Sequence, residues 1–385
     1  MLFVLLLCIM IAESSSHRNN LIVGLNPAYQ KIITIPKLTL GSVNRASEPI
    51  SVSIGGKGQN VLLSSACIIQ NKENMPYLLQ FCGKGYEGDT LIDLMSNLYS
   101  DKQRINELTI RNEGKVRTCM TLISDSETTE VIEPSLPILE DETLSLLEKL
   151  NDKYKNEKVN CMCIMGSVPP GLNSDIYSNI IKKVADKESI IIIDSLFGVS
   201  ECLQTCKELG TTTILKLNTR ELLKLANIKL VDGNESSMAI EDDKIFQAID
   251  YLKKNNELNT GKFYVCATDG PFSSIVINIQ TNKVYKIDIP NLKDKIINPI
   301  GAGDATAAGL LSKLSNIVDE SLTDIITGTG ENKVIFTDKY DEFIVNSFSF
   351  GLSVGSASCL SNINAYIENV ADVPYIFSKL KIRSM

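Results

Sequence analysis

The chain has 385 residues, of which 44% are apolar and 22% are charged, and this composition excludes a fibrous or largely disordered protein. Acidic residues outnumber basic ones by 46 to 38, which argues against a general nucleic-acid binder but still allows a few cations to surround an anionic ligand. The single histidine, His17, lies outside any periodic segment. Serine-histidine sites and multi-histidine metal sites are therefore disfavoured, and proton transfer is left to a carboxylate, Lys, Cys or Tyr.

The first 19 residues form an apolar extension that we set apart from the fold. Residues 1–12 are almost wholly apolar, but they are too few to span a bilayer, which takes about 20 residues. The segment is similar to a signal peptide without its basic start, and a disordered extension is the alternative. No later stretch has 18 consecutive apolar residues, so we expect no membrane span in the body. We expect a cytoplasmic protein, with organellar or secretory entry through the N-terminus as the alternative.

The ten cysteines do not form a recognisable framework. No CxxC pair occurs, so neither a zinc site nor thioredoxin chemistry is indicated. We interpret the cysteines as buried free thiols in a reducing compartment.

Short strands and helices alternate along most of the chain. Strands are predicted at 21–25, 32–35, 49–54, 77–82, 116–124, 129–132, 159–165, 190–194, 214–217 and 263–267. Helices are predicted at 59–70, 89–98, 139–154, 175–185, 219–225, 240–254, 303–314 and 342–360. Alternating buried strands and helices predict an α/β fold with a mostly parallel sheet covered on both faces.

Two groups of short strands do not fit this sheet. They lie at about 28–56 and 104–134, and we expect them to form a separate small β-sheet lid. Residues 316–339 look like an insertion with its own turns. In sheets of this kind ligands bind outside the carboxyl ends of the strands, where the glycine and Asn/Asp motifs of this chain fall.

The segment Asn298-Pro-Ile-Gly301-Ala302-Gly303-Asp304 is the strongest motif, and an apolar helix follows it. Two glycines around a small residue let the backbone approach a ligand, and the helix start presents unpaired N–H groups to it. Asp304 would lie in the first helical turn. A strand-to-helix turn with an acidic cap is the structural alternative.

Five motifs in order resemble those of the ribokinase/PfkB carbohydrate kinases, and the resemblance covers about residues 20–375. Gly55-Gly56-Lys57-Gly58-Gln59-Asn60 and 300–304 resemble the family's N-terminal and C-terminal signatures. The segments 26–28 with 41–45, 166–171 and 216–221 are similar to further family segments, the first pair to the opening of 1-phosphofructokinases and tagatose-6-phosphate kinases. The resemblance implies a ribokinase-like three-layer sandwich with a small β-sheet lid.

The resemblance also implies a phosphotransferase that uses ATP and Mg²⁺. Asp304 would take the proton from the attacking hydroxyl, and the N–H groups of Gly301, Ala302 and Gly303 would bind the transferred phosphoryl group. Asn218 and Glu221 would help to hold the metal through water. Their spacing also fits a helix N-cap with a capping-box acid, which is the structural alternative.

The substrates would meet the remaining motif residues. Gly55, Gly56 and Asn60 would line the sugar, with Lys57 and Arg117 at a substrate phosphate, since both side chains are common phosphate ligands. Surface charge is the alternative for either cation. The nucleotide would lie over Thr268 and Gly270, with Lys216 near its phosphates.

Two positions depart from the family pattern. Gln30 replaces an aspartate that binds sugar hydroxyls, which bears on the identity of the sugar. Ser273 replaces a second glycine after Gly270, which bears on the adenine contacts. A GxGxxG sequence at 83–88 matches a dinucleotide fingerprint, but it is a weak signal outside the first strand-helix unit, and we interpret it as a structural turn.

The sequence thus predicts ATP-dependent phosphorylation of a sugar phosphate. Fructose 1-phosphate, giving the 1,6-bisphosphate, is the first choice, and fructose 6-phosphate and tagatose 6-phosphate are close alternatives. A kinase for an unphosphorylated sugar or a nucleoside, and a catalytically idle binding or scaffold protein, are the other hypotheses. The resemblance also allows a homodimer through the lid, and we expect no nucleic-acid partner.

Overall fold

The computed structural model describes residues 19–124, 127–229, 239–256, 258, 261–292, 295–318, 336 and 338–385. Most of the apolar extension and most of the expected insertion at 316–339 lie outside these residues. Within the described part, no helix has both the length and the apolar character needed to cross a bilayer.

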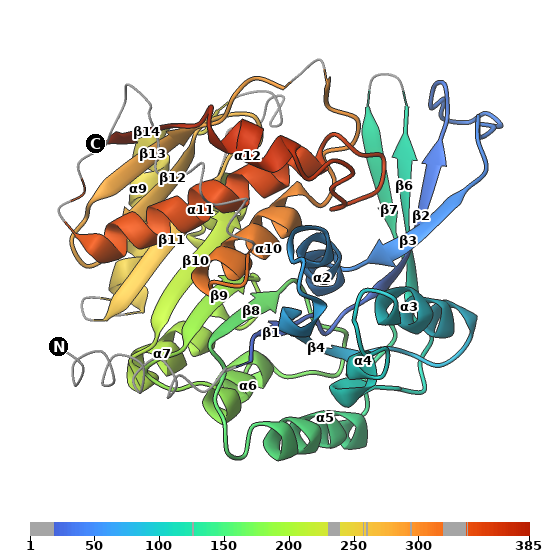
Figure 1. Cartoon of the computed structure of the whole chain (residues 1–385), viewed down its shortest axis with the longest axis horizontal. Coiled ribbons are helices and arrows are strands. Elements are labelled where there is room, and N and C mark those ends of the chain that lie inside the picture. Colours follow the sequence, from blue (N-terminus) through green and yellow to red (C-terminus); the bar gives the residue numbers. More distant parts are fainter. Residues whose placement is uncertain are drawn as a thin grey trace, which may run out of the picture.

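A ten-stranded sheet forms the centre of the molecule, in the order β14-β13-β12-β11-β10-β9-β8-β1-β4-β5 (Figure 1). The strands from β11 to β5 pair in parallel, whereas β12, β13 and β14 are antiparallel. Its strands are β1 Leu21–Val23, β4 Tyr77–Phe81, β5 Thr109–Ile110, β8 Cys161–Met165, β9 Ile190–Asp194, β10 Thr212–Asn218, β11 Lys262–Thr268, β12 Ser274–Asn278, β13 Val284–Asp288 and β14 Lys381–Ser384.

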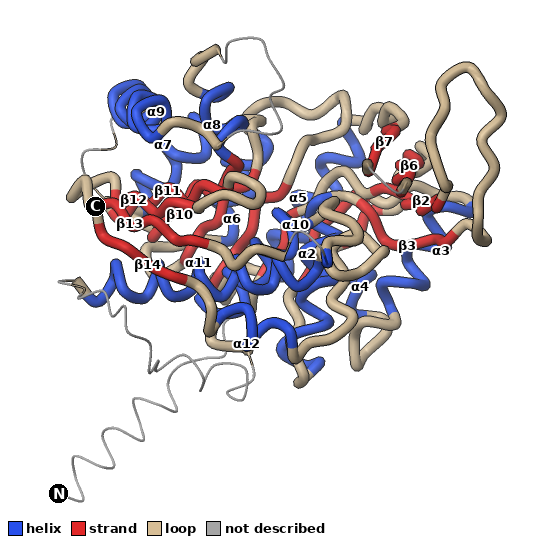
Figure 2. Tube along the Cα trace, turned by 90° about the horizontal axis from the view of Figure 1, so that it is seen from above, coloured by secondary structure: helices blue, strands red, loops and turns tan. Residues whose placement is uncertain are grey.

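Helices cover both faces of this sheet, as Figure 2 shows edge-on. One face carries α2 Lys57–Ile68, α3 Tyr86–Ser96, α4 Arg104–Glu107, α10 Ala302–Leu314, α11 Lys339–Ser358 and α12 Asp372–Phe377. The other carries α5 Glu140–Lys153, α6 Ile176–Val184, α7 Val199–Leu209, α8 Thr219–Leu225 and α9 Asp242–Asn255. A short 3₁₀ helix, η1, spans Lys72–Asn74. The α/β class with a mostly parallel, doubly covered sheet is confirmed.

Strands β1 and β8 are apolar throughout because both of their faces are buried. In β1, Ile22 packs into the core beneath α2 and α10, whereas Leu21 and Val23 pack into the core of the opposite face. Successive side chains of a strand point to opposite faces, so a strand between two helical layers can bury an apolar residue at every position.

A second, four-stranded sheet stands beside the carboxyl ends of these strands, in the order β3-β2-β6-β7 (Figure 1). Its strands are β2 Ala28–Thr34, β3 Ser51–Gly55, β6 Arg117–Ile123 and β7 Thr128–Ile132. β2 pairs in parallel with β6, and the other pairs are antiparallel. We call this sheet the lid. Its second segment is narrower than the expected 104–134, because residues 104–107 form α4 and 109–110 form β5 of the main sheet.

The GxGxxG segment is a packed turn between β4 and α3. A Cβ atom on Gly88 would lie 1.8 Å from the carbonyl oxygen of Gly83, and one on Gly83 would lie 1.8 Å from that of Gly114. Such contacts leave no room for a side chain, so these glycines serve backbone packing.

The nine described cysteines are all free, and all but Cys67 are buried. This agrees with their interpretation as core thiols.

Candidate active site

A cavity of about 710 Å³ lies between the carboxyl ends of the parallel strands and the lid. Residues just after β1, at the end of β8, β9, β10 and β11, and at the starts of α2 and α10 form its floor and walls. Side chains of β2, β6 and β7 close it from the lid side. The cavity therefore lies where a parallel sheet of this kind places ligands.

The start of α10 presents its backbone to the cavity. Gly301 is the N-cap with φ +84°, and a Cβ atom there would lie 2.7 Å from the amide nitrogen of Ala365, so only glycine fits. The Ala302 amide donates to Pro299 O at 3.3 Å, and the Ala305 amide donates to Gly301 O at 2.9 Å. The amides between them, of Gly303 and Asp304, belong to a helix start that has no intrahelical acceptor for them. An anion at this helix end would meet those two amides.

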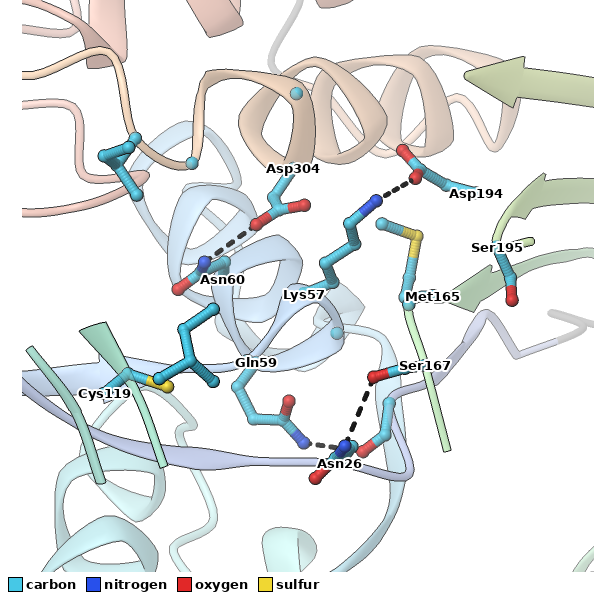
Figure 3. A pocket seen from close by; sticks show the side chains of 18 of the residues that line it. Asn26, Lys57, Gln59, Asn60, Cys119, Met165, Ser167, Asp194, Ser195 and Asp304 are labelled. Carbon is cyan, nitrogen blue, oxygen red and sulfur yellow. Dashed lines mark hydrogen bonds and ion pairs between the residues drawn. The ribbon is translucent and has the colours of Figure 1, made fainter. Parts of the chain in front are cut away.

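Asp304 is the buried carboxylate of the site, with 7% of its surface exposed. Its Oδ2 accepts a hydrogen bond of 2.8 Å from Asn60 Nδ2 on α2 (Figure 3). Burial raises the pKa of Asp304 to about 7, even though Lys57 and the Asn60 hydrogen bond favour the charged form. A carboxylate with a pKa near neutrality is suited to accept a proton in catalysis.

Two lysines share one buried carboxylate beside Asp304. Asp194, at the end of β9, accepts from Lys216 Nζ at 2.6 Å and from Lys57 Nζ at 2.8 Å. Burial alone would raise the pKa of Asp194, but the two lysines hold it below its ordinary value. Burial would likewise lower the pKa of Lys57, but Asp194, Asp304 and Glu221 hold it well above the ordinary value. The Lys57 ammonium group is therefore kept charged at the reacting end of the cavity.

Lys216 also lies against the helix start. A Cβ atom on Gly303 would be 3.7 Å from Lys216 Nζ, which places this ammonium group beside the amides of α10. The partial positive charge of the helix N-terminus and the lysine charge thus act on the same small volume.

The pair Asn218 and Glu221 forms a reciprocal capping box at the start of α8. Asn218 Oδ1 accepts from the Glu221 amide at 2.8 Å, and Glu221 Oε2 accepts from the Asn218 amide at 3.0 Å. The remaining carboxylate oxygen, Oε1, lies 3.3 Å from Lys57 Nζ. Within the described ranges no group of three His, Cys, Asp or Glu side chains could hold a metal directly. These donors suit a hydrated ion bound through water.

The start of α2 forms the wall opposite α10. Gly56 is its N-cap with φ +99°, and a Cβ atom there would collide with Gln59 Oε1 and with the backbone at Asn26 and Pro27. Gln59 Nε2 donates to Gly24 O at 2.7 Å. Among the described residues, the carbonyl oxygens of Gln59 and Asn60 are buried without a hydrogen-bond partner. Both residues line the cavity, and the protein itself leaves these two acceptors unused.

The lid contributes polar side chains to the other wall. Arg117, at the start of β6, donates through Nη2 to Asn26 O at 3.1 Å. Gln30 is buried and donates through Nε2 to Thr121 Oγ1 at 2.9 Å. Asn26 Nδ2 in turn donates to Ser167 Oγ at 3.2 Å (Figure 3).

The cavity brings together most of the residues expected from the sequence. Those that line it are Gln30, Gly56, Lys57, Asn60, Arg117, Lys216, Asn218, Glu221, Thr268, Gly301, Gly303 and Asp304. Gly55 ends β3 and Ala302 begins α10 without lining the cavity, and Gly270 lies in the turn after β11 with φ +58°. Lys57 was expected at a substrate phosphate together with Arg117, but the two cations have different partners.

Several lining residues were missed at the level of sequence, Asp194 above all. An available signal was its position, because an acid directly after the apolar run Ile190-Ile-Ile-Ile193 must lie at the carboxyl edge of the sheet. Ser167 and Asn26 fall inside motifs that were recognised without a role for these side chains. Glu130 lines the cavity because β7 pairs with β6 in a register that places Glu130 opposite Thr121. No local sequence pattern indicates this register.

Comparison with known proteins gives a consistent picture. Residues 22–328 match the model of the pfkB family of carbohydrate kinases. A tagatose-6-phosphate kinase from Staphylococcus epidermidis is 28% identical over 329 residues, covering 83% of this chain and 95% of that protein.

Solved structures show the same fold. Phosphofructokinase-2 from Escherichia coli in complex with substrates and products superposes with a TM-score of 0.67 at 19% identity, over 94% of this chain and 98% of that one. The same enzyme has been solved in a tetrameric inhibited form. A ribokinase from Thermotoga maritima gives a TM-score of 0.59 at 16% identity, over 94% and 100% of the two chains. The expected ribokinase-like fold is confirmed.

Burial of Asp304 predicts a pH-dependent cost to stability. Its pKa is raised from 3.8 to about 7 in the folded state, so the unfolded chain releases the proton first and stability is lost as the pH rises through this interval. Asp304→Asn should therefore raise the free energy of unfolding at pH 8 by up to about 4 kcal/mol, with a smaller gain at pH 5. Urea unfolding at both pH values measures this. Asp250→Asn, at an exposed position, is the control, and an Asp304→Asn gain that does not change with pH would contradict the assignment.

Proposed function

The chain belongs to the pfkB family of carbohydrate kinases, and we propose that it transfers the γ-phosphoryl group of ATP to a hydroxyl group of a ketohexose phosphate. The observation that carries the proposal is the position of Asp304. This carboxylate lies in the first turn of α10, hydrogen-bonded to Asn60, in a cavity that also contains Lys57 and Lys216. Asp304 would take the proton from the attacking hydroxyl.

The positive groups around Asp304 would stabilise the transferred phosphoryl group. Amides at the start of α10 would bind its oxygens, with those of Gly303 and Asp304 in place of the Ala302 amide, which is directed to Pro299 O. Lys216 lies beside these amides, and Lys57 lies between Asp194 and Glu221. We assign Lys57 to the phosphoryl group rather than to the phosphate of the sugar, because its ammonium group lies among the carboxylates of the reacting end.

Mg²⁺ would neutralise the charge of the phosphate chain during transfer. Glu221 and Asn218 would hold the hydrated ion through water. The Glu221 oxygen outside their capping box, Oε1, pairs with Lys57 in this structure. Asp194 is the other carboxylate near this position. For the nucleotide, Thr268 at the end of β11 lines the cavity, whereas Gly270 would shape the turn beside it.

The sugar would lie between α2 and the lid. The unpartnered oxygens of Asn60 and Gln59 would accept hydrogen bonds from sugar hydroxyls. The Nε2 of Gln30 is used by Thr121, so its Oε1 is the atom left to accept from the ligand. Closure of the lid would exclude water and limit hydrolysis of ATP.

A phosphate on the substrate would meet Arg117. Its guanidinium group is tethered by backbone carbonyls at Asn26 and Pro27, which fixes its position while leaving further N–H groups for an anion. Asn26, whose backbone carbonyl accepts from Arg117, donates through its side chain to Ser167 Oγ. The Ser167 hydroxyl would donate a further hydrogen bond to the phosphate.

Fructose 1-phosphate is our first choice of acceptor, on the motifs at 26–28 and 41–45. Tagatose 6-phosphate is the second candidate, because the tagatose-6-phosphate kinase of S. epidermidis covers most of this chain. Fructose 6-phosphate is the third.

The lid also offers a surface for a second copy of the chain. Leu40, Val43 and Ile50 in the connection between β2 and β3 are 88%, 79% and 52% exposed, and Val131 on β7 is 44% exposed. Burial of such side chains is favourable, and a homodimer through the lid would provide it.

A panel of acceptors tests the function. ATP consumption by the wild type should depend on Mg²⁺ and on a ketohexose phosphate, with kcat/KM at least tenfold above that for free hexoses and nucleosides. Asp304→Asn should reduce kcat by 10³-fold or more, since the base is lost while the fold is retained. Equal activity on a neutral sugar would favour a sugar or nucleoside kinase. No transfer to any acceptor, or transfer unaffected by Asp304→Asn, would leave a binding or scaffold protein.

The role of Arg117 is tested separately. Arg117→Ala should raise the KM for the sugar phosphate by about 10- to 100-fold, because a charge-assisted contact to phosphate is lost, and should change the KM for ATP less than threefold. Lys115→Ala, which removes an exposed cation two residues earlier, is the matched control. An unchanged KM for the sugar phosphate would place the phosphate elsewhere.

A further inference from the structure

We propose that a chain of four buried side chains couples the lid to the phosphoryl-binding loop, and that Thr121 and Asn364 are positioning residues for phosphoryl transfer. The chain runs from Gln30 through Thr121 and Asn364 to Asn298. It joins two lid strands, the segment after α11 and the loop before α10. The inference rests on the proposed function, because it assigns the loop at 298–304 to the phosphoryl group.

Three hydrogen bonds join the four side chains, and a fourth joins the last side chain to the backbone of the loop. Gln30 Nε2 donates to Thr121 Oγ1 at 2.9 Å, and Asn364 Nδ2 donates to the same oxygen at 3.1 Å. Asn298 Nδ2 donates to Asn364 Oδ1 at 2.7 Å, and the Ile300 amide donates to Asn298 Oδ1 at 3.0 Å. The four side chains have between 0% and 2% of their surface exposed. Hydrogen bonds in such surroundings are costly to leave unmade, so the links hold one another in place.

The donated hydrogen bonds converge on Thr121 from both ends of the chain. Gln30 donates to Thr121 from the lid side, whereas Asn298 donates to Asn364 and Asn364 donates to Thr121 from the loop side. An aspartate at position 30 would have no proton to donate to Thr121. The glutamine that departs from the family pattern thus forms the lid end of the chain.

The segment around Asn364 also holds the loop from a second side. The amides of Ile297 and Asn298 donate to Cys359 O at 2.8 and 3.2 Å. Ser64 on α2 donates to Ala365 O, and Ala365 packs so closely on Gly301 that no Cβ atom would fit there. A shift of Asn364 would therefore displace Gly301, in the turn that begins α10.

The lid end of the chain faces the substrate. Gln30 lines the cavity, and its Oε1 is the free acceptor of that amide. A sugar that draws Gln30 and the lid toward the cavity would shorten the hydrogen bonds that connect Gln30 to Ile300. The position of Gly301 would then be more tightly fixed. The loop would then be held in its phosphoryl-binding geometry when an acceptor is present, and errors of about 1 Å in such geometry cost about 100-fold in rate.

Thr121→Val tests the proposal, with Thr121→Ser as the variant that restores the hydroxyl. Thr213→Val is the matched control, since Thr213 is a fully buried strand threonine whose hydroxyl shares a hydrogen bond with Thr211, away from the cavity. We expect Thr121→Val to lower kcat for the ketohexose phosphate at least tenfold, with the KM for ATP changed less than twofold. Thr121→Ser should recover most of the loss, and Thr213→Val should lose less than threefold.

Hydrogen exchange of the peptide that covers 298–304 gives an independent readout. In the wild type, a saturating ketohexose phosphate should slow exchange of this peptide, and Thr121→Val should abolish most of that protection while the sugar still binds. Equal kcat and equal protection in Thr121→Val and Thr213→Val would overturn the proposal. If the wild type phosphorylates no acceptor, the proposed function fails by itself. The hydrogen-bonded chain of four side chains is then tested by hydrogen exchange of the protein without ligand. The 298–304 amides of Thr121→Val should exchange at least threefold faster than those of Thr213→Val, and equal rates would overturn the proposal.

Discussion

A carboxylate withdrawn from water resists ionisation, and the architecture of this active site follows from that constraint. Asp304, Asp194 and Glu221 converge on one region of the cavity, with Lys57 and Lys216 between them. Three acids against two cations leave the group one negative charge in excess when all are ionised. Both lysines donate hydrogen bonds to Asp194, which lowers its pKa. Asp304 accepts a hydrogen bond from Asn60, and burial raises its pKa to about 7. The charge states of the proposed base and of the cations proposed to bind the phosphoryl group therefore depend on one electrostatic balance.

The main sheet creates this balance through its topology. Parallel strands place the ends of β8, β9, β10 and β11 along one edge, so residues distant in sequence, such as Met165, Asp194, Asn218 and Thr268, meet there. Strand β12 runs antiparallel to β11 and β13 runs antiparallel to β12, so β13 leads the chain back to the same edge, where α10 begins. The lid supplies the remaining wall, and its side chains would contact the acceptor substrate.

Local patterns in the sequence predicted the elements and the motif glycines well. Continuous apolar runs located β8 and β9, and the glycine turns located the starts of α2 and α10. The sequence indicated Asp304, Asn60 and Lys216 because each lies inside a motif. It did not indicate which partner Lys57 would choose, since Asp194 is 137 residues away. For Asn218 and Glu221, both the metal role and the capping box fitted the spacing, and the coordinates show the capping box.

The links between lid and loop were beyond the reach of sequence for the same physical reason. Thr121 and Asn364 are separated by 243 residues and have no local signature, because an isolated threonine or asparagine is compatible with many environments. Gln30 was visible only as a departure from a family pattern. Its structural meaning depends on the pairing of β2 with β6, a register that a single sequence does not encode in a readable form.

The pH dependence of kcat/KM, measured for the wild type and for Asn60→Leu, tests the central claim most directly, with Ser65→Ala on the same helix as the control. If Asp304 is the base, kcat/KM falls as the pH drops below its pKa of about 7, because the carboxylate is then protonated. Asn60→Leu removes the hydrogen bond that favours the charged form, so its acid limb should move to higher pH by about one unit, and that of Ser65→Ala should not move. An acid limb that stays in place in Asn60→Leu, or one centred near pH 4 in the wild type, would contradict the assignment of Asp304 as the buried base.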